Sequence, residues 1–219
     1  PNSQLIKTVT FNKPFDMLKA QAAKAPNMID RFDAIVAINA ENFLVKKDLL
    51  IDLLKNEKFF GCRAEIAKQL VNKIDSIDMT TVQLLINDKH VKVRLSVIEN
   101  VKDIPSAFIP VFEKLLTDSS YKVVEESLNK LVKQNPAETH QYLNTTKNDV
   151  GVGSAVKVKW LEIACSFEAD KSYLPELIAR SSNEYEFRTR SAAFEALKRL
   201  NYLDEKVAIN LMDAITHFN

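Results

Sequence analysis

Apolar residues recur along the chain at a constant spacing of 31 residues. One column of this repeat consists of the pairs Leu53-Leu54, Leu84-Leu85, Leu115-Leu116, Leu177-Ile178 and Ala208-Ile209. The column is interrupted at Thr146-Lys147, where the same spacing meets a polar pair. A second column with this spacing consists of Leu70, Val101, Val132, Ile163 and Phe194. Two columns that share one period indicate a repeated structural unit.

Each period contains two amphipathic helices with a polar turn between them. The first helices place apolar residues on one face, as in the set Leu49, Leu50, Leu53 and Leu54. The second helices do the same, as in the set Val93, Val97, Ile98 and Val101. Turns such as "NDKH" and "TDSSY" are rich in Asn, Asp and Ser, as turns generally are. Pro105 and Pro136 stand near expected helix starts, and Asp78, Thr80 and Asp204 are available as N-caps.

A single helix pair of this size cannot bury its apolar stripe, whereas a stack of pairs can. The pattern therefore predicts an all-α fold, an α-α superhelix of the armadillo type with about six helix pairs over residues 26–219. We expect the last helix, in "LDEKVAINLMDAITHFN", to close the stack. Its outer face is predicted to carry Asn210, Asp213 and His217 as a polar cap.

Residues 1–25 follow a different pattern from the rest of the chain. Within "LIKTVTFN", Leu5, Val9 and Phe11 alternate with polar or β-branched residues, which predicts a short strand. One isolated strand is not stable alone. We therefore expect it either to pack on the helices or to end a β-sandwich that precedes them. The chain also begins without a Met, so we expect it to be part of a larger protein.

Composition favours helices and disfavours several function classes. Three glycines in 219 residues are few for a β-rich protein with many tight turns. Lys and Arg number 30 and Asp and Glu number 29, so no charge excess favours nucleic acid or a membrane surface as a partner. No apolar run approaches the roughly 18 residues of a membrane span. A cytoplasmic and a periplasmic or secreted location both stay open.

One turn carries a specific pairing signal. Asp88 lies in the turn between two helices, and Arg94 follows it six residues later, early in the second helix. This arrangement resembles HEAT repeats, in which such an Asp and Arg form a ladder through the stack. Polar groups in these turns need partners because neighbouring repeats bury them. We predict that Asp88 and Arg94 stabilise the turn as a pair, although the same spacing from Asp118 meets Val124.

The N-terminal part of the chain contains two further patterns. V-x-F-x-K is present at Val9, Phe11 and Lys13, and A-P-x-x-x-D-R-x-x-A extends from Ala25 to Ala34. Together they resemble a junction found late in bacterial aminopeptidase N-like zinc metallopeptidases. In that family the first pattern ends a β-sandwich and the second leads into a C-terminal α-solenoid.

The resemblance implies that this chain is the non-catalytic C-terminal domain of such a peptidase, covering the active-site chamber and restricting entry to peptides. The zinc ion and its H-E-x-x-H motif would belong to a catalytic domain outside this chain. The three histidines, His90, His140 and His217, do not form that motif. We therefore assign the chain no catalytic residue, metal ligand or cofactor. Its expected partners are the other domains of the peptidase and a peptide substrate or a protein.

Several residues leave a structural and a functional interpretation open. Cys62 and Cys165 lie in apolar helical stripes, so we expect buried, reduced thiols rather than a nucleophile or a disulfide. Trp160 is expected to pack between repeats, with a partner-binding hot spot as the alternative. Arg188 and Arg190 are expected to form ion pairs within the fold, with binding of a peptide carboxylate as the alternative.

Two features are weaker candidates for anion binding. His90 lies in a turn between Lys89 and Lys92, where a solvated turn is the simpler interpretation. The segment "VGVGSAVK", residues 150–157, places two glycines before a helix, where backbone amides can bind a phosphate. It lacks the rest of a P-loop, so we expect an irregular loop between repeats.

Two other functions are rivals of the peptidase domain. A free-standing scaffold would bind a protein partner on the concave face of the stack. Such a scaffold should begin with a capped helix rather than with a strand. A DNA-binding HEAT-like protein of the alkylpurine glycosylase type would need a basic concave groove, which the balance of 30 to 29 charges disfavours.

Overall fold

The computed structural model describes residues 13–167 and 171–216, and within these ranges the chain forms helices and no strand. The α-helices are α1 Phe15–Lys24, α2 Met28–Ile38, α3 Phe43–Asn56, α4 Phe60–Val71, α5 Met79–Ile86, α6 Val91–Asn100, α7 Ile109–Phe112, α8 Tyr121–Gln134, α9 Thr139–Thr146, α10 Ala155–Phe167, α11 Leu174–Ala179, α12 Phe187–Arg199 and α13 Glu205–Thr216. The 3₁₀ helices are η1 Ile74–Ser76, η2 Ser106–Phe108, η3 Glu113–Thr117, η4 Pro136–Glu138, η5 Val152–Ser154 and η6 Lys171–Tyr173. The predicted all-α class is confirmed, and the predicted strand lies outside the described residues.

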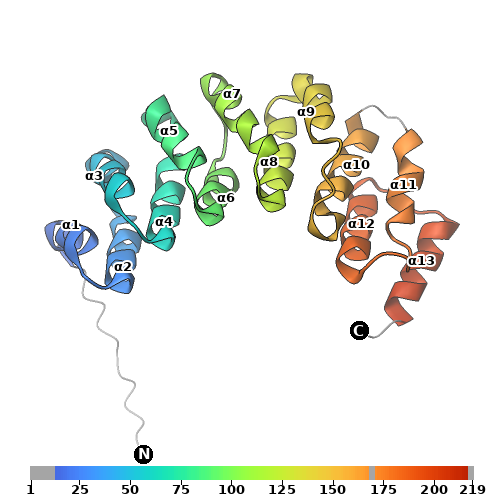
Figure 1. Cartoon of the computed structure of the whole chain (residues 1–219), viewed down its shortest axis with the longest axis horizontal. Coiled ribbons are helices and arrows are strands. Elements are labelled where there is room, and N and C mark those ends of the chain that lie inside the picture. Colours follow the sequence, from blue (N-terminus) through green and yellow to red (C-terminus); the bar gives the residue numbers. More distant parts are fainter. Residues whose placement is uncertain (1–12, 168–170, 217–219) are drawn as a thin grey trace, which may run out of the picture.

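The helices form two rows that together make an arch (Figure 1). The inner row contains α2, α4, α6, α8, α10 and α12, and each of these helices packs against the next one in the row. The outer row contains α1, α3, α5, α7 with η3, α9 and α11, whose contacts with one another are sparse. Close packing on one side and open spacing on the other bend the stack, so the inner row lines the concave side.

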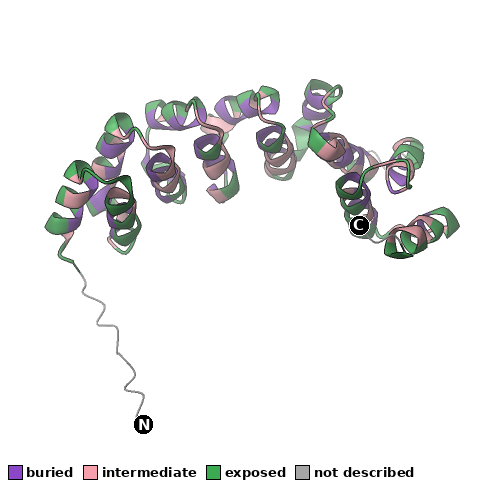
Figure 2. Ribbon diagram, turned by 60° about the horizontal axis from the view of Figure 1, so that its bottom comes forward, coloured by how far each residue is buried: buried purple, intermediate pink, exposed green. Residues whose placement is uncertain are grey.

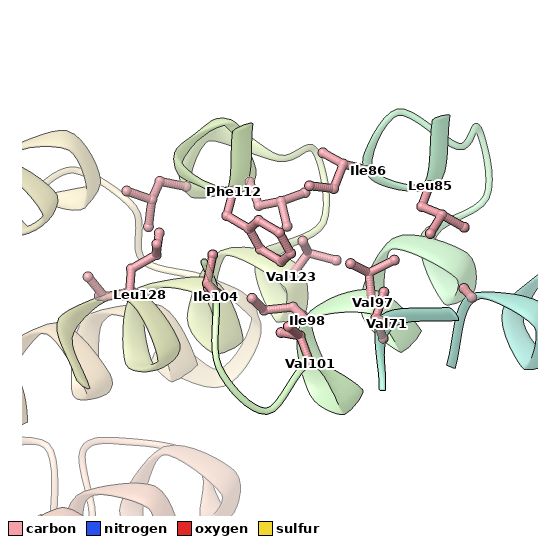
Figure 3. Close-up of a cluster of buried hydrophobic side chains, with 14 of the residues drawn as sticks. Val71, Leu85, Ile86, Val97, Ile98, Val101, Ile104, Phe112, Val123 and Leu128 are labelled. Atoms are coloured by element: carbon pink, nitrogen blue, oxygen red, sulfur yellow. The ribbon is translucent and has the colours of Figure 1, made fainter. Parts of the chain in front are cut away.

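A continuous apolar core lies between the two rows (Figures 2 and 3). The 31-residue column predicts it well at Leu54, Leu85 and Leu116, each at most 4% exposed. Leu84 is 43% exposed, whereas the residues at the same place in the column, Leu53, Leu115 and Leu177, are at most 7% exposed. Figure 3 shows side chains of α5, α6, α7 and α8 meeting in this core, including Phe112, which is fully buried.

Helix starts follow the sequence signals in part. Asp78 caps α5 by accepting a hydrogen bond from the Thr81 amide at 2.7 Å. Asp204 does the same before α13, where the Val207 amide donates at 2.8 Å. Thr80 does not act as an N-cap, because it lies inside α5. Each cap satisfies an amide that the first helical turn would otherwise leave unpaired.

The last helix is oriented differently from the prediction. Asn210 and Asp213 turn toward the stack, where the Asn210 amide donates to Ser181 Oγ at 2.8 Å and Arg190 donates to Asp213 at 2.7 Å. The outward face carries apolar side chains that are 60–67% exposed, namely Ile209, Met212 and Ile215. The predicted polar cap is therefore wrong at Asn210 and Asp213, because a buried guanidinium and hydroxyl need these polar partners. His217 lies outside the described residues.

Candidate functional site

Arginine occupies the fourth position of several inner helices. These residues are Arg31 in α2, Arg63 in α4, Arg94 in α6 and Arg190 in α12. The fourth residue is valine in α8 and in α10, at Val124 and Val158. Arg63, Arg94 and Arg190 are at most 9% exposed, so their charges require partners within the fold.

For Arg31, Arg63 and Arg94 the partners are carboxylates in the turn of the next repeat, whereas Arg190 pairs with Asp213 inside α13. Arg63 donates from Nε and Nη2 to Asp88 at 2.7 and 3.0 Å. Arg94 donates in the same way to Asp118 at 2.6 and 2.7 Å. Arg31 makes the equivalent pair with Glu57 at 2.8 and 3.0 Å. Two parallel hydrogen bonds to one carboxylate are the strongest geometry available to arginine.

The acid of each ion pair also stabilises the turn in which it lies. The carboxylate of Asp88 accepts the amide of His90 at 2.8 Å, and that of Asp118 accepts the amide of Ser120 at 2.7 Å. Arg94 uses its third nitrogen, Nη1, to donate to the main-chain carbonyl of Asp88 at 2.8 Å. Every acid therefore connects an inter-helix turn to the arginine of the preceding repeat. We call the set formed by Arg31–Glu57, Arg63–Asp88 and Arg94–Asp118 the arginine ladder.

The predicted pair of Asp88 and Arg94 has a different geometry from a side-chain ion pair. The two residues meet through the Asp88 carbonyl, while the Asp88 carboxylate binds Arg63 and the Arg94 guanidinium binds Asp118. The sequence pattern indicated both residues but not their side-chain partners, Arg63 for Asp88 and Asp118 for Arg94. A search for Arg and acid at the separations of 24 to 26 residues seen here would have detected the ladder.

The electrostatic environment of the ladder favours the charged forms of its acids and of its arginines. Burial by itself raises the pKa of Glu57 and of Asp88, but the hydrogen bonds and positive charge of their arginines outweigh it, so both pKa values lie below the ordinary range. The hydrogen bonds to Asp118 raise the pKa of Arg94, and those to Asp88 raise the pKa of Arg63. All four groups are therefore ionised at neutral pH.

The structure separates the two arginines that were considered for peptide binding. Arg190 is 8% exposed and donates to Asp213 at 2.7 Å and to the carbonyl of Ser181 at 3.3 Å. Arg188 is exposed and has no ion-pair partner among the described residues. Arg188 is therefore accessible to a ligand, whereas Arg190 is engaged inside the stack.

Trp160 lies in the core, at 4% exposure. Its Nε1 donates to the carbonyl of Leu143 at 2.7 Å, and its ring meets Tyr173 edge-on with centroids 5.0 Å apart. The ammonium of Lys157 lies 4.6 Å from the Trp160 centroid, so a cation covers part of the ring. The side chain packs between α9, α10 and η6 and presents little surface to a partner.

A cleft of about 740 Å³ lies where the inner helices α6, α8 and α12 begin, beside the loop that precedes α10. The side chains that matter for its chemistry are Lys89, His90, Tyr121, Lys122, Val152 and Arg188. Tyr121 is 47% exposed and Val152 is 71% exposed, so the cleft offers apolar as well as cationic surface. It adjoins α8 and α10, the two inner helices that lack the ladder arginine.

The cations of this cleft differ in how they are paired. Lys122 donates to Glu125 at 3.2 Å and forms an ion pair with Glu126 at 2.7 Å, and Arg94 is held by Asp118. Lys89 and Arg188 form no ion pair within the described part of the chain. The cleft therefore keeps two unneutralised positive charges on its walls.

The glycine-rich segment forms an irregular loop at the edge of this cleft. Gly151 and Gly153 adopt positive φ angles of 77° and 59°, which glycine accommodates without strain. The carbonyl of Val150 accepts the amide of Lys157 at 3.2 Å, and the hydroxyl of Ser154 accepts a hydrogen bond from Arg180 at 3.0 Å. The loop presents Val152 to the cleft, so its contribution there is apolar.

The remaining candidate groups have structural partners. His90 stacks on Phe60 with ring centroids 3.7 Å apart, and its Nδ1 accepts the amide of Lys92 at 3.2 Å. Cys62 is fully buried and Cys165 is half-buried, and neither forms a disulfide. The described ranges contain no group of His, Cys, Asp or Glu side chains that could hold a metal ion. Over the same ranges no helix is long and apolar enough to span a membrane.

Comparison with known proteins leaves the family open. No protein-family model, no curated protein and no solved structure matches the chain.

Proposed function

We propose that the chain is the non-catalytic C-terminal domain of an aminopeptidase N-like zinc metallopeptidase, built as a HEAT-like α-solenoid. Its role is steric: the arch forms a wall over the active-site chamber and limits entry to peptides. The zinc ion belongs to the catalytic domain of that enzyme and not to this chain. Peptide substrate and the other domains of the enzyme are its partners.

The observation that carries this proposal is the structure of the segment that resembles the peptidase junction. Arg31, the arginine of its A-P-x-x-x-D-R pattern, donates from Nη1 to the carbonyls of Ala25 and Pro26 at 2.9 and 3.2 Å. The same guanidinium binds Glu57 and so forms the first rung of the ladder. The pattern therefore has a physical purpose, because its arginine ties the entering chain to the first repeat.

The surface of the arch suits a steric barrier rather than a catalytic site. Its inner row carries charges of both signs, for example Lys159 and Arg199, which share Glu162 at 2.8 and 2.6 Å. Pairs of this kind connect α10 to α12 and stiffen the inner row. A mixed-charge, internally paired surface disfavours a polyanion such as DNA, which needs a continuous basic stripe.

Expression of the complete reading frame that encodes this chain tests the proposal. We expect the full protein to cleave aminoacyl-aminocoumarin substrates and to lose that activity with a zinc chelator, whereas residues 1–219 alone cleave none. A version of the full protein that lacks the helical domain, residues 26–219, should retain cleavage of these small substrates. It should lose its discrimination against long polypeptides. A reading frame without a zinc peptidase domain, or activity in residues 1–219 alone, would overturn the proposal.

The alternative is a free-standing scaffold that binds a protein partner on its concave face. The cationic cleft favours a binding role of some kind, because two of its charges are unpaired. The reading frame distinguishes the two functions, since a scaffold needs no catalytic domain. In that case, affinity purification with the full protein should recover a stoichiometric partner.

A further inference from the structure

We propose that the cleft where α6, α8 and α12 begin binds a peptide carboxylate, with an apolar residue of the same peptide against Tyr121 and Val152. This inference deepens the proposed function, on which it rests for the nature of the ligand as a peptide. The domain would then bind its peptide ligand at a defined site, in addition to its steric role.

The first support is that two positive charges in the cleft have no acidic partner within the described ranges. Along the ladder each arginine is neutralised by an acid of the next repeat, as Arg94 is by Asp118. In the cleft, Lys89 comes from the turn before α6 and Arg188 from the start of α12, and neither has an acidic partner in the described structure. An arginine at such a position can hold a carboxylate through two parallel hydrogen bonds, with the lysine as a second point charge.

The second support is the apolar surface that lines the same cleft as these cations. Tyr121 and Val152 expose 47% and 71% of their surface, and Val91 and Ala155 also line the cleft. A binding cleft usually combines apolar walls with a few polar groups that fix orientation. A ligand that suits this cleft has an anionic group and an apolar side chain close together, as a peptide does.

The charge balance selects a carboxylate rather than a polyphosphate. Glu125 lines the same cleft and, with Glu126, neutralises Lys122. Several phosphates would meet these carboxylates and be repelled, whereas one carboxylate needs only the two unpaired cations. A second hollow, between α12 and α13, is a poorer candidate because Arg190 is already bound to Asp213 there and Glu186 and Glu195 add negative charge.

A peptide carboxylate has two sources, the C-terminus and an acidic side chain, and the experiment separates them. The chain is titrated into three fluorescein-labelled octapeptides, and anisotropy reports binding. One peptide has an apolar C-terminal residue with a free carboxylate, the second is its C-terminal amide, and the third is the amide with an internal Glu beside the apolar residue. Binding of the first alone assigns the C-terminus, and binding of the third assigns the side chain.

Variants connect binding to the cleft. We expect Arg188→Gln with Lys89→Gln to weaken binding of the preferred peptide by about tenfold or more, because both charge-assisted contacts are lost. Lys24→Gln, an exposed lysine on α1, is the matched control and should leave affinity unchanged. Thermal melts followed by circular dichroism establish that all variants are folded.

Three results would overturn the inference. They are equal affinity for all three peptides, unchanged affinity in the double variant, and competition by millimolar inorganic phosphate as effective as that by the free-carboxylate peptide. These measurements use residues 1–219 alone, so they can fail while the parent protein still proves to be a zinc peptidase. Conversely, carboxylate binding by the cleft would survive a reading frame that lacks a peptidase domain.

Discussion

Arg94 and Asp118 belong to different repeats and are joined by two hydrogen bonds, Nε to Oδ2 at 2.6 Å and Nη2 to Oδ1 at 2.7 Å. Their side chains are 10% and 7% exposed, so the pair is shielded from water. Because each repeat contacts mainly its neighbours, the stability of a stack depends on interfaces of this kind. The ladder therefore couples the repeats that it connects.

Replacing Arg94 with Ala should lower the free energy of unfolding by about 3–5 kcal/mol, since it leaves the buried Asp118 carboxylate without its cation. Urea unfolding followed by circular dichroism, with the fluorescence of the single Trp160 as a second probe, measures the change. Arg188→Ala is the matched control, because Arg188 is exposed and unpaired, and its effect should stay within about 0.5 kcal/mol.

An Arg94→Ala protein as stable as the unchanged chain would mean that the rung contributes no net stability. The same variant should leave carboxylate binding in the cleft largely intact, because Arg94 is already committed to Asp118. Loss of peptide binding at an unchanged urea midpoint would instead place Arg94 in the binding site.

One substitution can introduce the ladder arginine that α8 lacks. Val124 occupies the ladder position, and Asp149 follows it by 25 residues, as Asp88 follows Arg63. The Asp149 side chain has no hydrogen-bond or ion-pair partner among the described residues. We expect Val124→Arg to pair with Asp149, although Val124 is 1% exposed and its apolar contacts are lost.

A double-mutant cycle isolates this new pair from the lost packing. Val124→Arg in the unchanged background should be more stable than the same substitution combined with Asp149→Asn, with a coupling energy of about 1–3 kcal/mol. Chemical denaturation of the four proteins gives the cycle. A coupling energy of zero would show that the α9–α10 turn holds Asp149 out of reach.

The sequence predicts the repeat because periodicity is a local signal. Leu54, Leu85 and Leu116 are buried as their spacing requires, and the caps at Asp78 and Asp204 follow from side-chain chemistry within three residues. Such features need no knowledge of which helices are neighbours in space.

Contacts between repeats are harder to predict, because they depend on how neighbouring helix pairs stack. The acid that binds Arg94 lies 24 residues further along, and the six-residue spacing from Asp88 reflects a carbonyl contact instead. The prediction for the outward face of α13 was wrong for a similar reason. Asn210 and Asp213 face the stack because Ser181 and Arg190 need them, and no local pattern reveals that need. The cleft combines residues from α6, α8 and α12, so periodicity along the chain does not reveal it.

Acid should destabilise the stack through the ladder carboxylates. The folded-state pKa of Asp88 lies below its ordinary value of 3.8 and that of Glu57 below 4.5, because their arginines favour the ionised forms despite burial. Their contribution is therefore fully present above those ordinary values and is lost as the pH falls through the lower folded-state values.

Asp88→Asn tests this acid dependence, because asparagine resembles a protonated aspartate in shape and charge. At pH 6 the variant should be less stable than the unchanged chain, and the difference should shrink as the pH falls toward 2. Urea midpoints measured at intervals between these limits give the trend. A difference that stays constant with pH would assign the effect of the substitution to packing rather than to charge.

Cys62 should be unreactive in the folded chain even though it is a free thiol. It is fully buried, its Sγ lies 3.8 Å from the carbonyl of Met28, and burial raises its pKa to about 11. At pH 8 about one molecule in a thousand would then carry the thiolate, which is the form that iodoacetamide attacks. We expect peptide mapping after alkylation to find Cys62 unmodified in the native chain and modified in urea, while the half-buried Cys165 reacts earlier. Alkylation of native Cys62 at its rate in urea would mean that the α2–α4 interface opens readily, and Arg63→Ala, which removes the neighbouring rung, should bring native alkylation closer to that rate.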